Sequence, residues 1–326
     1  MQFKEQLVDR FGRKITYVRF SITPRCNFDC FYCSSKKPQD ALVKEFNLED
    51  IDFLFSGLAK VGINKLRLTG GEPLIRQDIT EIVRTARARG IEEVVLTTNG
   101  FRLFELASQL KEAGLSRANI SLDTLRPEVF KRITGVDAFE SVYKGIFKSI
   151  EVGLNPVKIN TVLLNNVNND DLLGLAKLSI DYPITVRFIE LMPTKDNDSF
   201  KKHFLGFKTA LSMINSQYDL VRTTGNDGEV ASYYQIPNAK GKIGFITPVS
   251  QHFCAYCNRI RITSRGEIYP CLFSPIKVDI FKAVRLRDLD LLISRIYESV
   301  AIKPESHSLI SSESTTSISN MRELGG

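Results

Sequence analysis

The sequence is first informative for what it lacks. No apolar run in its 326 residues approaches the roughly 20 residues that a membrane-spanning helix needs. Residues 1–14 carry too many charges for the apolar core of a secretory signal. We therefore expect a soluble, cytoplasmic protein that has no membrane partner.

Blocks of basic residues are also missing, although the formal net charge is +7. The Lys and Arg residues are scattered, and no run of about five to eight of them occurs. This distribution does not favour a nucleic-acid partner. An acidic small molecule or an acidic protein partner explains the charge equally well.

Spare cysteines are lacking too, because all six fall into two groups of three. A reducing cytoplasm disfavours disulfide bonds, and a chain of ordinary composition, 43% hydrophobic and 25% charged, does not need them. We therefore expect metal binding or catalysis to account for the cysteines.

Short apolar strands alternate with helical segments, which is the pattern of βαβ units and a parallel sheet. Helices are expected at residues 48–61 and 78–89, each followed by a glycine. Six repeats predict an α/β fold, a partial (β/α)6 TIM barrel over residues 1–225. The expected strands are Tyr17–Thr23, Lys65–Thr69, Val94–Asn99, Asn119–Asp123, Val157–Leu164 and Thr185–Leu191.

The pattern then changes to an α+β extension, assigned to residues 226–300 and expected to close the barrel. A helix at Phe207–Ser216 precedes strand-like pieces with glycine turns at Gly225, Gly228, Gly241 and Gly266. Residues 301–326 form a Ser-rich tail that ends in Gly325-Gly326 and is expected to be mobile.

Several expected strands alternate polar and apolar residues, although strands buried on both faces read as continuous apolar runs. Side chains alternate strictly across a strand, so each polar set lies on one face. We expect this face to line a cavity for a ligand with several negative charges. An antiparallel sheet with one wet face is the alternative. The polar set is Arg19, Ser21, Thr23, Lys65, Arg67, Thr69, Asn119, Ser121, Asp123, Lys158 and Asn160.

The loop after the first expected strand carries Cys26, Cys30 and Cys33, a C-x3-C-x2-C motif. Structural zinc normally takes four ligands, whereas a [4Fe-4S] cluster held by three thiolates keeps one iron open. The motif also lies at the C-terminal end of a barrel strand, where active sites form. We interpret it as the signature of a radical S-adenosylmethionine enzyme, with zinc or a redox thiol as the alternative.

A second motif, Gly70-Gly71-Glu72-Pro73, directly follows the second expected strand. Glycines let the backbone approach a ligand closely. Alone, the motif is equally compatible with a turn, but its position one βα unit after the cysteine loop favours a cofactor site. In radical S-adenosylmethionine enzymes it contacts the methionine amino group.

The remaining cysteines, Cys254, Cys257 and Cys271, form a C-x2-C-x13-C motif. Three ligands with no cysteine left over indicate a second cluster with its own open iron. His252 or His307 could instead complete a zinc site, since C-x2-C with a distant third ligand is common in zinc ribbons.

Over nearly its whole length the sequence resembles the MoaA family of radical S-adenosylmethionine enzymes, the GTP 3',8-cyclases of molybdenum cofactor biosynthesis. The resemblance rests on both cysteine motifs, the GGEP motif, the terminal Gly-Gly and residues 96–100, 119–123, 187–192, 228–231 and 258–261. One departure is Ser34-Ser35, where the family often has Met-Pro.

The resemblance implies two [4Fe-4S] clusters, S-adenosyl-L-methionine as cofactor and GTP as substrate, with the second cluster binding the guanine ring. From the residues alone, packing or solvated roles are the alternative. The implied S-adenosylmethionine contacts are Tyr32, Gly71, Glu72, Ser121 and Met192. The implied GTP contacts are Arg19, Lys65, Arg67, Thr97, Lys158, Arg187, Arg259 and Arg261, and the implied catalytic tail is Gly325 and Gly326.

The implied reaction converts GTP to (8S)-3',8-cyclo-7,8-dihydroguanosine 5'-triphosphate after a 5'-deoxyadenosyl radical removes the ribose 3'-hydrogen. It needs an electron donor, and the next pathway enzyme forms cyclic pyranopterin monophosphate; the family also suggests a homodimer. The alternatives are a peptide-modifying radical enzyme with auxiliary clusters and a zinc-stabilised nucleic-acid-binding protein.

Overall fold

The structure, a computed structural model, describes residues 6–33, 45–194, 199–223, 230–251, 254–306 and 321–325. Its centre is a curved sheet of six strands that all pair in parallel with their neighbours. The antiparallel alternative is therefore wrong, and the expected strand ends are correct to within two residues. The six strands are β1 (Tyr17–Ser21), β2 (Lys65–Thr69), β3 (Glu93–Thr98), β4 (Arg117–Ser121), β5 (Val157–Leu163) and β6 (Ile184–Glu190).

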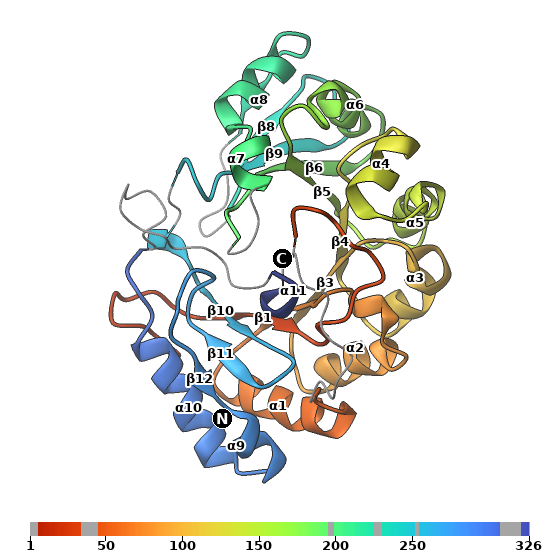
Figure 1. Ribbon diagram of the computed structural model, residues 1–326. Coiled ribbons are helices and arrows are strands. Elements are labelled where there is room, and N and C mark those ends of the chain that lie inside the picture. Colours follow the sequence, from red (N-terminus) through yellow and green to blue (C-terminus); the bar gives the residue numbers. More distant parts are fainter. Residues whose placement is uncertain are drawn as a thin grey trace.

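Helices connect these strands and lie on the outside of the sheet (Figure 1). The first begins with a capping box, in which Asn47 and Asp50 each accept a hydrogen bond from the other's backbone N–H, as helix starts favour. None of the described helices is both long and apolar enough to span a bilayer. The helices are α1 (Leu48–Lys60), α2 (Ile79–Ala88), α3 (Leu103–Glu112), α4 (Pro127–Thr134), α5 (Phe139–Glu151) and α6 (Leu172–Asp181).

The C-terminal extension lengthens the sheet at both edges. Beside β6 lie β9 (Lys242–Ile246), β8 (Ser232–Gln235) and β7 (Val221–Arg222). Beside β1 lie β10 (Arg259–Ile262), β11 (Glu267–Tyr269) and β12 (Val278–Asp279). The described strands run in the order β12-β11-β10-β1-β2-β3-β4-β5-β6-β9-β8-β7, so the extension widens the barrel and does not close it by strand pairing.

The described residues form five further helices, of which the last lies inside the barrel. The other four are α7 (Ser199–His203), α8 (Phe207–Asn215), α9 (Phe281–Arg285) and α10 (Leu289–Ala301). α8 packs against α6 and β6, whereas α9 and α10 pack against α1. The last, α11 (Met321–Leu324), sits with the C-terminus at the centre of the ring of strands in Figure 1. The expectation of a mobile tail is therefore wrong for residues 321–325, which are folded against the barrel interior.

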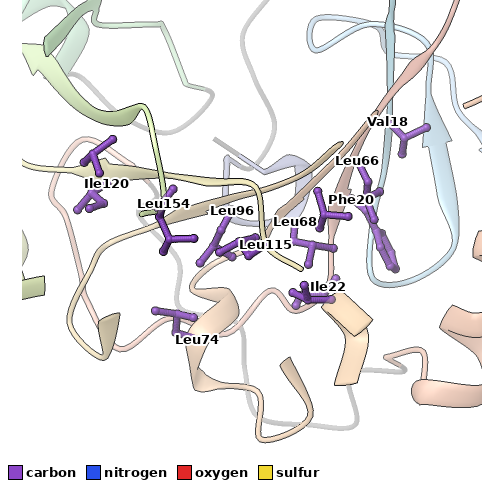
Figure 2. Packing of buried hydrophobic residues seen from close by; sticks show 14 of the residues in the cluster. Val18, Phe20, Ile22, Leu66, Leu68, Leu74, Leu96, Leu115, Ile120 and Leu154 are labelled. Carbon is purple, nitrogen blue, oxygen red and sulfur yellow. The ribbon is translucent and has the colours of Figure 1, made fainter. Parts of the chain in front are cut away.

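The apolar faces of the strands turn toward the helices and form the main core. Val18, Phe20 and Ile22 are buried there beside Leu66 and Leu68, as Figure 2 shows. Burying each such side chain contributes roughly 1.5–3 kcal/mol. Because side chains alternate along a strand, this packing turns the polar residues between them into the barrel.

The strand register brings basic residues together inside the barrel. Arg19 on β1 is aligned with Arg67 on β2 and with Arg261 on β10. Aligned residues of parallel neighbours face the same side of the sheet. Three strands therefore place three guanidinium groups at one level of the interior.

Candidate active site

Two cavities lie inside the barrel and share part of their walls. The first is lined by Cys26, Cys30 and Cys33, and the second by Cys254, Cys257 and Cys271. Asn160, Ile189 and Met192 line both cavities. A molecule in one cavity would therefore lie next to a molecule in the other.

The first cysteine loop is held in place by backbone contacts with the end of α4. Asp29 N donates to Thr134 O at 2.8 Å, and Phe31 N donates to Ile133 O at 3.1 Å. These bonds fix the segment between the first and third cysteines and turn all three into the first cavity. None of the six cysteines, all of which are described, forms a disulfide bond.

The thiols of this loop suit a cluster that takes thiolates and leaves one iron open. Burial raises the pKa of the Cys26 thiol to about 11 and that of the Cys30 thiol well above its usual value. Burial also raises the pKa of the Cys33 thiol. A bound cluster would supply the positive charge that keeps such thiols ionised. Among the described residues, no group of three or more His, Cys, Asp or Glu is placed to hold a single metal ion.

The GGEP turn packs tightly against the chain that enters the cysteine loop. A Cβ on Gly70, whose φ is +154°, would lie 2.3 Å from Thr23 O, and one on Gly71 would lie 2.2 Å from Arg25 O. Only glycine fits at these two positions. Both glycines line the first cavity, so the turn brings bare backbone to the predicted S-adenosylmethionine site.

Glu72 lies behind the cavity wall and not among its lining residues. Its carboxylate, 1% exposed, accepts from Thr98 Oγ1 at 2.7 Å, from Asn99 N at 2.6 Å and from Leu74 N at 2.9 Å. The side chain therefore ties the GGEP turn to the end of β3. The contact of Glu72 with S-adenosylmethionine stays a prediction.

Glu72 also predicts a pH-dependent stability. Burial raises its pKa from 4.5 to about 7 despite three hydrogen bonds that lower it, so its contribution is fully present below 4.5 and is lost as pH rises through about 7. In Glu72→Gln, we expect the change in the free energy of unfolding between low and high pH to be smaller by on the order of 3 kcal/mol. Urea unfolding of the cluster-free protein at about pH 5 and pH 8 measures this. An equal pH dependence in both proteins would contradict it.

Three other predicted S-adenosylmethionine contacts, Tyr32, Ser121 and Met192, line the first cavity. The Tyr32 hydroxyl donates to Asp123 Oδ2 at 2.6 Å, and Val162 N donates to Asp123 Oδ1 at 2.8 Å. Burial raises the pKa of Asp123 to about 6. Asp123 was predicted to face the cavity with the rest of the polar set, but no cofactor or substrate contact was assigned to it.

Thr97 was predicted among the GTP contacts, but the structure has it on the wall of the first cavity. Its hydroxyl accepts from Arg67 Nη1 at 3.4 Å, and Arg67 lines the second cavity. Thr97 therefore lies near the boundary between the two cavities.

The second cysteine triplet is assembled by the extension. Cys254 begins a 3₁₀ turn, η3 (Cys254–Tyr256), Cys257 directly follows it, and Cys271 comes two residues after the end of β11. Burial opposes ionisation of Cys257, but Arg259 and Lys303 lower the pKa of its thiol to about 7. His252 and His307, the candidate zinc ligands, lie outside the described residues, as do Gly228 and Glu229 of the family motif.

The wall of the second cavity is strongly basic. All predicted GTP contacts except Thr97 line it, and Arg117 and Lys303 join them. No Asp or Glu occurs among the described lining residues. The pKa of Tyr17 reflects this positive charge. Burial alone would raise the pKa of its hydroxyl, but Arg67, Arg19 and other nearby cations lower it to about 8. The predicted GTP contacts on this wall are Arg19, Lys65, Arg67, Lys158, Arg187, Arg259 and Arg261.

Two arginines of this wall show how it is suited to an anion. Arg187 donates to Asn160 Oδ1 at 2.6 Å and to Asn119 Oδ1 at 3.0 Å. Burial and the charge of Arg67 lower the pKa of Arg187 to about 10, so it stays cationic at neutral pH. Arg67 Nε is buried without a hydrogen-bond partner among the described residues. Such groups suit an anion that accepts several hydrogen bonds.

The C-terminal tail enters the space between the two triplets. Arg322, 4% exposed, donates to Asp29 Oδ1 at 2.7 Å in the first cysteine loop. Arg261 Nη1 donates to Leu324 O at 2.9 Å and to Gly325 O at 2.6 Å. The tail thus contacts the first loop and the basic wall together. Gly326 lies outside the described residues.

A parallel barrel whose first strand leads into a cavity lined by three cysteines and a glycine turn defines a radical S-adenosylmethionine enzyme. The profile of the Radical SAM superfamily matches residues 20–179, and that of Molybdenum Cofactor Synthesis C matches residues 184–309. The crystal structure of Streptococcus suis SuiB bound to S-adenosylmethionine matches with a TM-score of 0.59 at 15% identity, covering 87% of this chain and 68% of that chain. This likeness concerns the fold.

Relatives that match over nearly the whole length show which family of radical S-adenosylmethionine enzymes the chain belongs to. A protein named GTP 3',8-cyclase from Clostridium botulinum (strain Langeland) is 38% identical over 326 residues, covering 98% of this chain and 100% of the relative. One of the same name from Peptoclostridium acidaminophilum is 40% identical over 319 residues, covering 95% of each chain. The chain belongs to the GTP 3',8-cyclase family. The family prediction and the fold prediction are confirmed, and a [4Fe-4S] cluster and S-adenosylmethionine are its cofactors.

Proposed function

We propose that this protein is a radical S-adenosylmethionine GTP 3',8-cyclase that acts in molybdenum cofactor biosynthesis. The observation that carries the proposal is the contact between two unlike cavities. One has a cysteine triplet beside a glycine turn, and the other has a second triplet within a wall of Lys and Arg. Sharing Asn160, Ile189 and Met192, they would hold a radical source and a polyanionic substrate side by side.

The basic wall is proposed to bind the triphosphate of GTP. Arginine offers a planar fork that matches phosphate oxygens, and lysine offers a point charge. Arg187 is buried, Arg19 and Arg67 are half-buried, and all three lie on strands of the sheet, which fixes their positions. Rigid placement on strands lowers the ordering cost of binding.

The second triplet is proposed to hold a second [4Fe-4S] cluster whose open iron binds the guanine ring. Three thiols without a fourth cysteine suit such a cluster. The described residues that line this cavity include no carboxylate that would repel a nucleotide. This seat would orient the base while the arginines hold the phosphates. The ribose would then lie toward the shared wall.

The reaction divides between the cofactors and the chain. Cys26, Cys30 and Cys33 would hold the first cluster, which, when bound and reduced, would supply the electron for cleavage of S-adenosylmethionine and thus for removal of the ribose 3'-hydrogen. The chain positions the two molecules and excludes water, which is the contribution expected of the protein in cofactor chemistry. Gly325 and Gly326 are proposed to assist from the tail, with Arg261 holding the last turn.

The remaining assignments rest on the family resemblance. We propose a barrel at residues 1–225, an extension at 226–300 and a tail at 301–326. We further propose a homodimer, an external electron donor and a following enzyme that forms cyclic pyranopterin monophosphate. Cysteines that form no disulfide bonds suit a reducing compartment, which favours the cytoplasm.

The test is anaerobic incubation of the reconstituted protein with GTP, S-adenosylmethionine and dithionite, followed by mass spectrometry. We expect 5'-deoxyadenosine and the cyclised nucleotide to form together. Deoxyadenosine without a product from GTP would keep the enzyme class and refute the substrate. If neither product forms, the proposal as a whole is refuted.

Arg187→Met is expected to weaken GTP binding. Losing a charged hydrogen-bond donor costs about 1.5–3 kcal/mol, so KM for GTP should rise about 10- to 100-fold. Steady-state assays of the cyclised product measure this. Arg84→Met on the surface of α2, where the side chain is 54% exposed, is the matched control and should leave KM unchanged. An unchanged KM in Arg187→Met would contradict the proposed seat of the triphosphate.

A further inference from the structure

Lys303 is a buried lysine that follows α10 and lies beside the second cysteine triplet. Its side chain is 1% exposed. The ammonium nitrogen Nζ donates to Pro270 O at 2.6 Å, to Arg259 O at 2.9 Å and to Cys257 Sγ at 3.5 Å. An ammonium group has three N–H donors, so all three are used.

These three contacts join the two chain segments that supply the triplet. Cys257 and Arg259 belong to the segment that leads into β10, whereas Pro270 immediately precedes Cys271. A single side chain therefore connects the C-x2-C pair to the third cysteine across the intervening β10–β11 hairpin.

The burial of this ammonium group requires compensation. Removing a charge from water is costly unless it is paired and hydrogen-bonded. Carbonyl oxygens satisfy two donors, but no Asp or Glu is present among the described residues that line this cavity. Thiolate ligands of an iron–sulfur cluster would provide the missing negative charge where the third donor points.

We propose that Lys303 is a positioning residue for the second cluster: it holds the two ligand segments together and donates an N–H···S hydrogen bond to the Cys257 ligand. This inference rests on the proposed second cluster. Hydrogen bonds to the sulfurs and nearby charge set the potentials of such clusters. A cation with an N–H···S bond favours the reduced, more negative form, so Lys303 raises the reduction potential.

The test isolates the second triplet in the full chain. Cys26, Cys30 and Cys33 are replaced with alanine, and the protein is reconstituted anaerobically with iron and sulfide. About four irons per chain are expected, the content of one [4Fe-4S] cluster. Zinc or no iron in this background would overturn the second cluster, and with it the role of Lys303, before Lys303 is changed.

Lys303→Met is then introduced and the midpoint potential is followed by electron paramagnetic resonance. We expect the equilibrium constant for reduction of the cluster to fall at least about tenfold, which lowers its midpoint potential by about 59 mV for one electron. Iron release to a chelator should also become faster. Lys277→Met is the matched control in the same extension, because that lysine is 51% exposed and pairs with Glu267 on β11.

Lys303→Arg keeps a cation and N–H donors and is expected to restore most of the potential. If Lys303→Met does not fold, as circular dichroism would reveal, the shorter neutral Lys303→Gln takes its place in the same titration. A potential and iron-release rate equal to those of the background protein, in a folded neutral variant that holds four irons, would overturn the proposal.

Discussion

Replacing Cys26, Cys30 and Cys33 with alanine is expected to abolish cleavage of S-adenosylmethionine and formation of the cyclised nucleotide. Replacing Cys254, Cys257 and Cys271 is expected to abolish only the cyclised nucleotide and to leave some uncoupled 5'-deoxyadenosine. The reason is spatial, because the first triplet lines the cavity with the glycine turn and the second lines the basic cavity. Each variant should lose about four irons per chain.

The two variants act as controls for each other. Both remove three half-buried thiols, so a general loss of stability would affect them alike. Anaerobic assays that quantify iron, 5'-deoxyadenosine and the nucleotide product separate the effects. Equal loss of both products in the two variants, with folded proteins, would contradict the division of labour between the triplets.

Gly325→Val is expected to lower the rate of nucleotide formation about 100-fold, as small displacements of positioning groups can. Gly325 has a φ of +72°, and a Cβ there would lie 2.0 Å from Thr69 Oγ1 on β2. The valine cannot be seated without moving the tail away from Arg261. Iron content should stay at the parent value, because neither triplet is touched by this change.

A matched control separates the clash from backbone strain. Gly90 has a φ of +83°, but no atom lies within 4 Å of a Cβ built on it. Gly90→Val therefore introduces a similar strain, about 1–2 kcal/mol, without a clash. It should lower stability slightly and leave the turnover rate unchanged. Parent-like turnover in Gly325→Val would contradict a role for the docked tail.

Local alternation made much of the barrel and its basic wall predictable. Val18, Phe20 and Ile22 pack under the helices, and this requires Arg19 between them to face inward. The same rule applies to Lys158 and Asn160 on β5. A period of two residues is a property of the strand itself, so a single sequence carries it.

Contacts between distant segments were not predictable in this way. Arg322 pairs with Asp29, and Lys303 reaches Cys257, yet no local pattern links either pair. Their partners are chosen by how the tail and α10 dock on the finished barrel. The inward placement of Arg117 and the turn of Glu72 into the wall likewise depend on tertiary packing.

The extension shows the same limit at the level of topology. Its glycine turns indicated short strands, but β10 pairs in parallel with β1 although about 240 residues separate them. The sequence alone offers no register for such a pairing. That register aligns Arg261 with Arg19 and so completes the basic wall.

The most direct test of the account uses GTP that carries deuterium at the ribose 3' position. The proposed arrangement puts the ribose beside the radical source, so 5'-deoxyadenosine from an anaerobic reaction should gain one deuterium by mass spectrometry. Unlabelled 5'-deoxyadenosine, formed while the cyclised nucleotide accumulates, would contradict the claim that the two cavities bring these two molecules together.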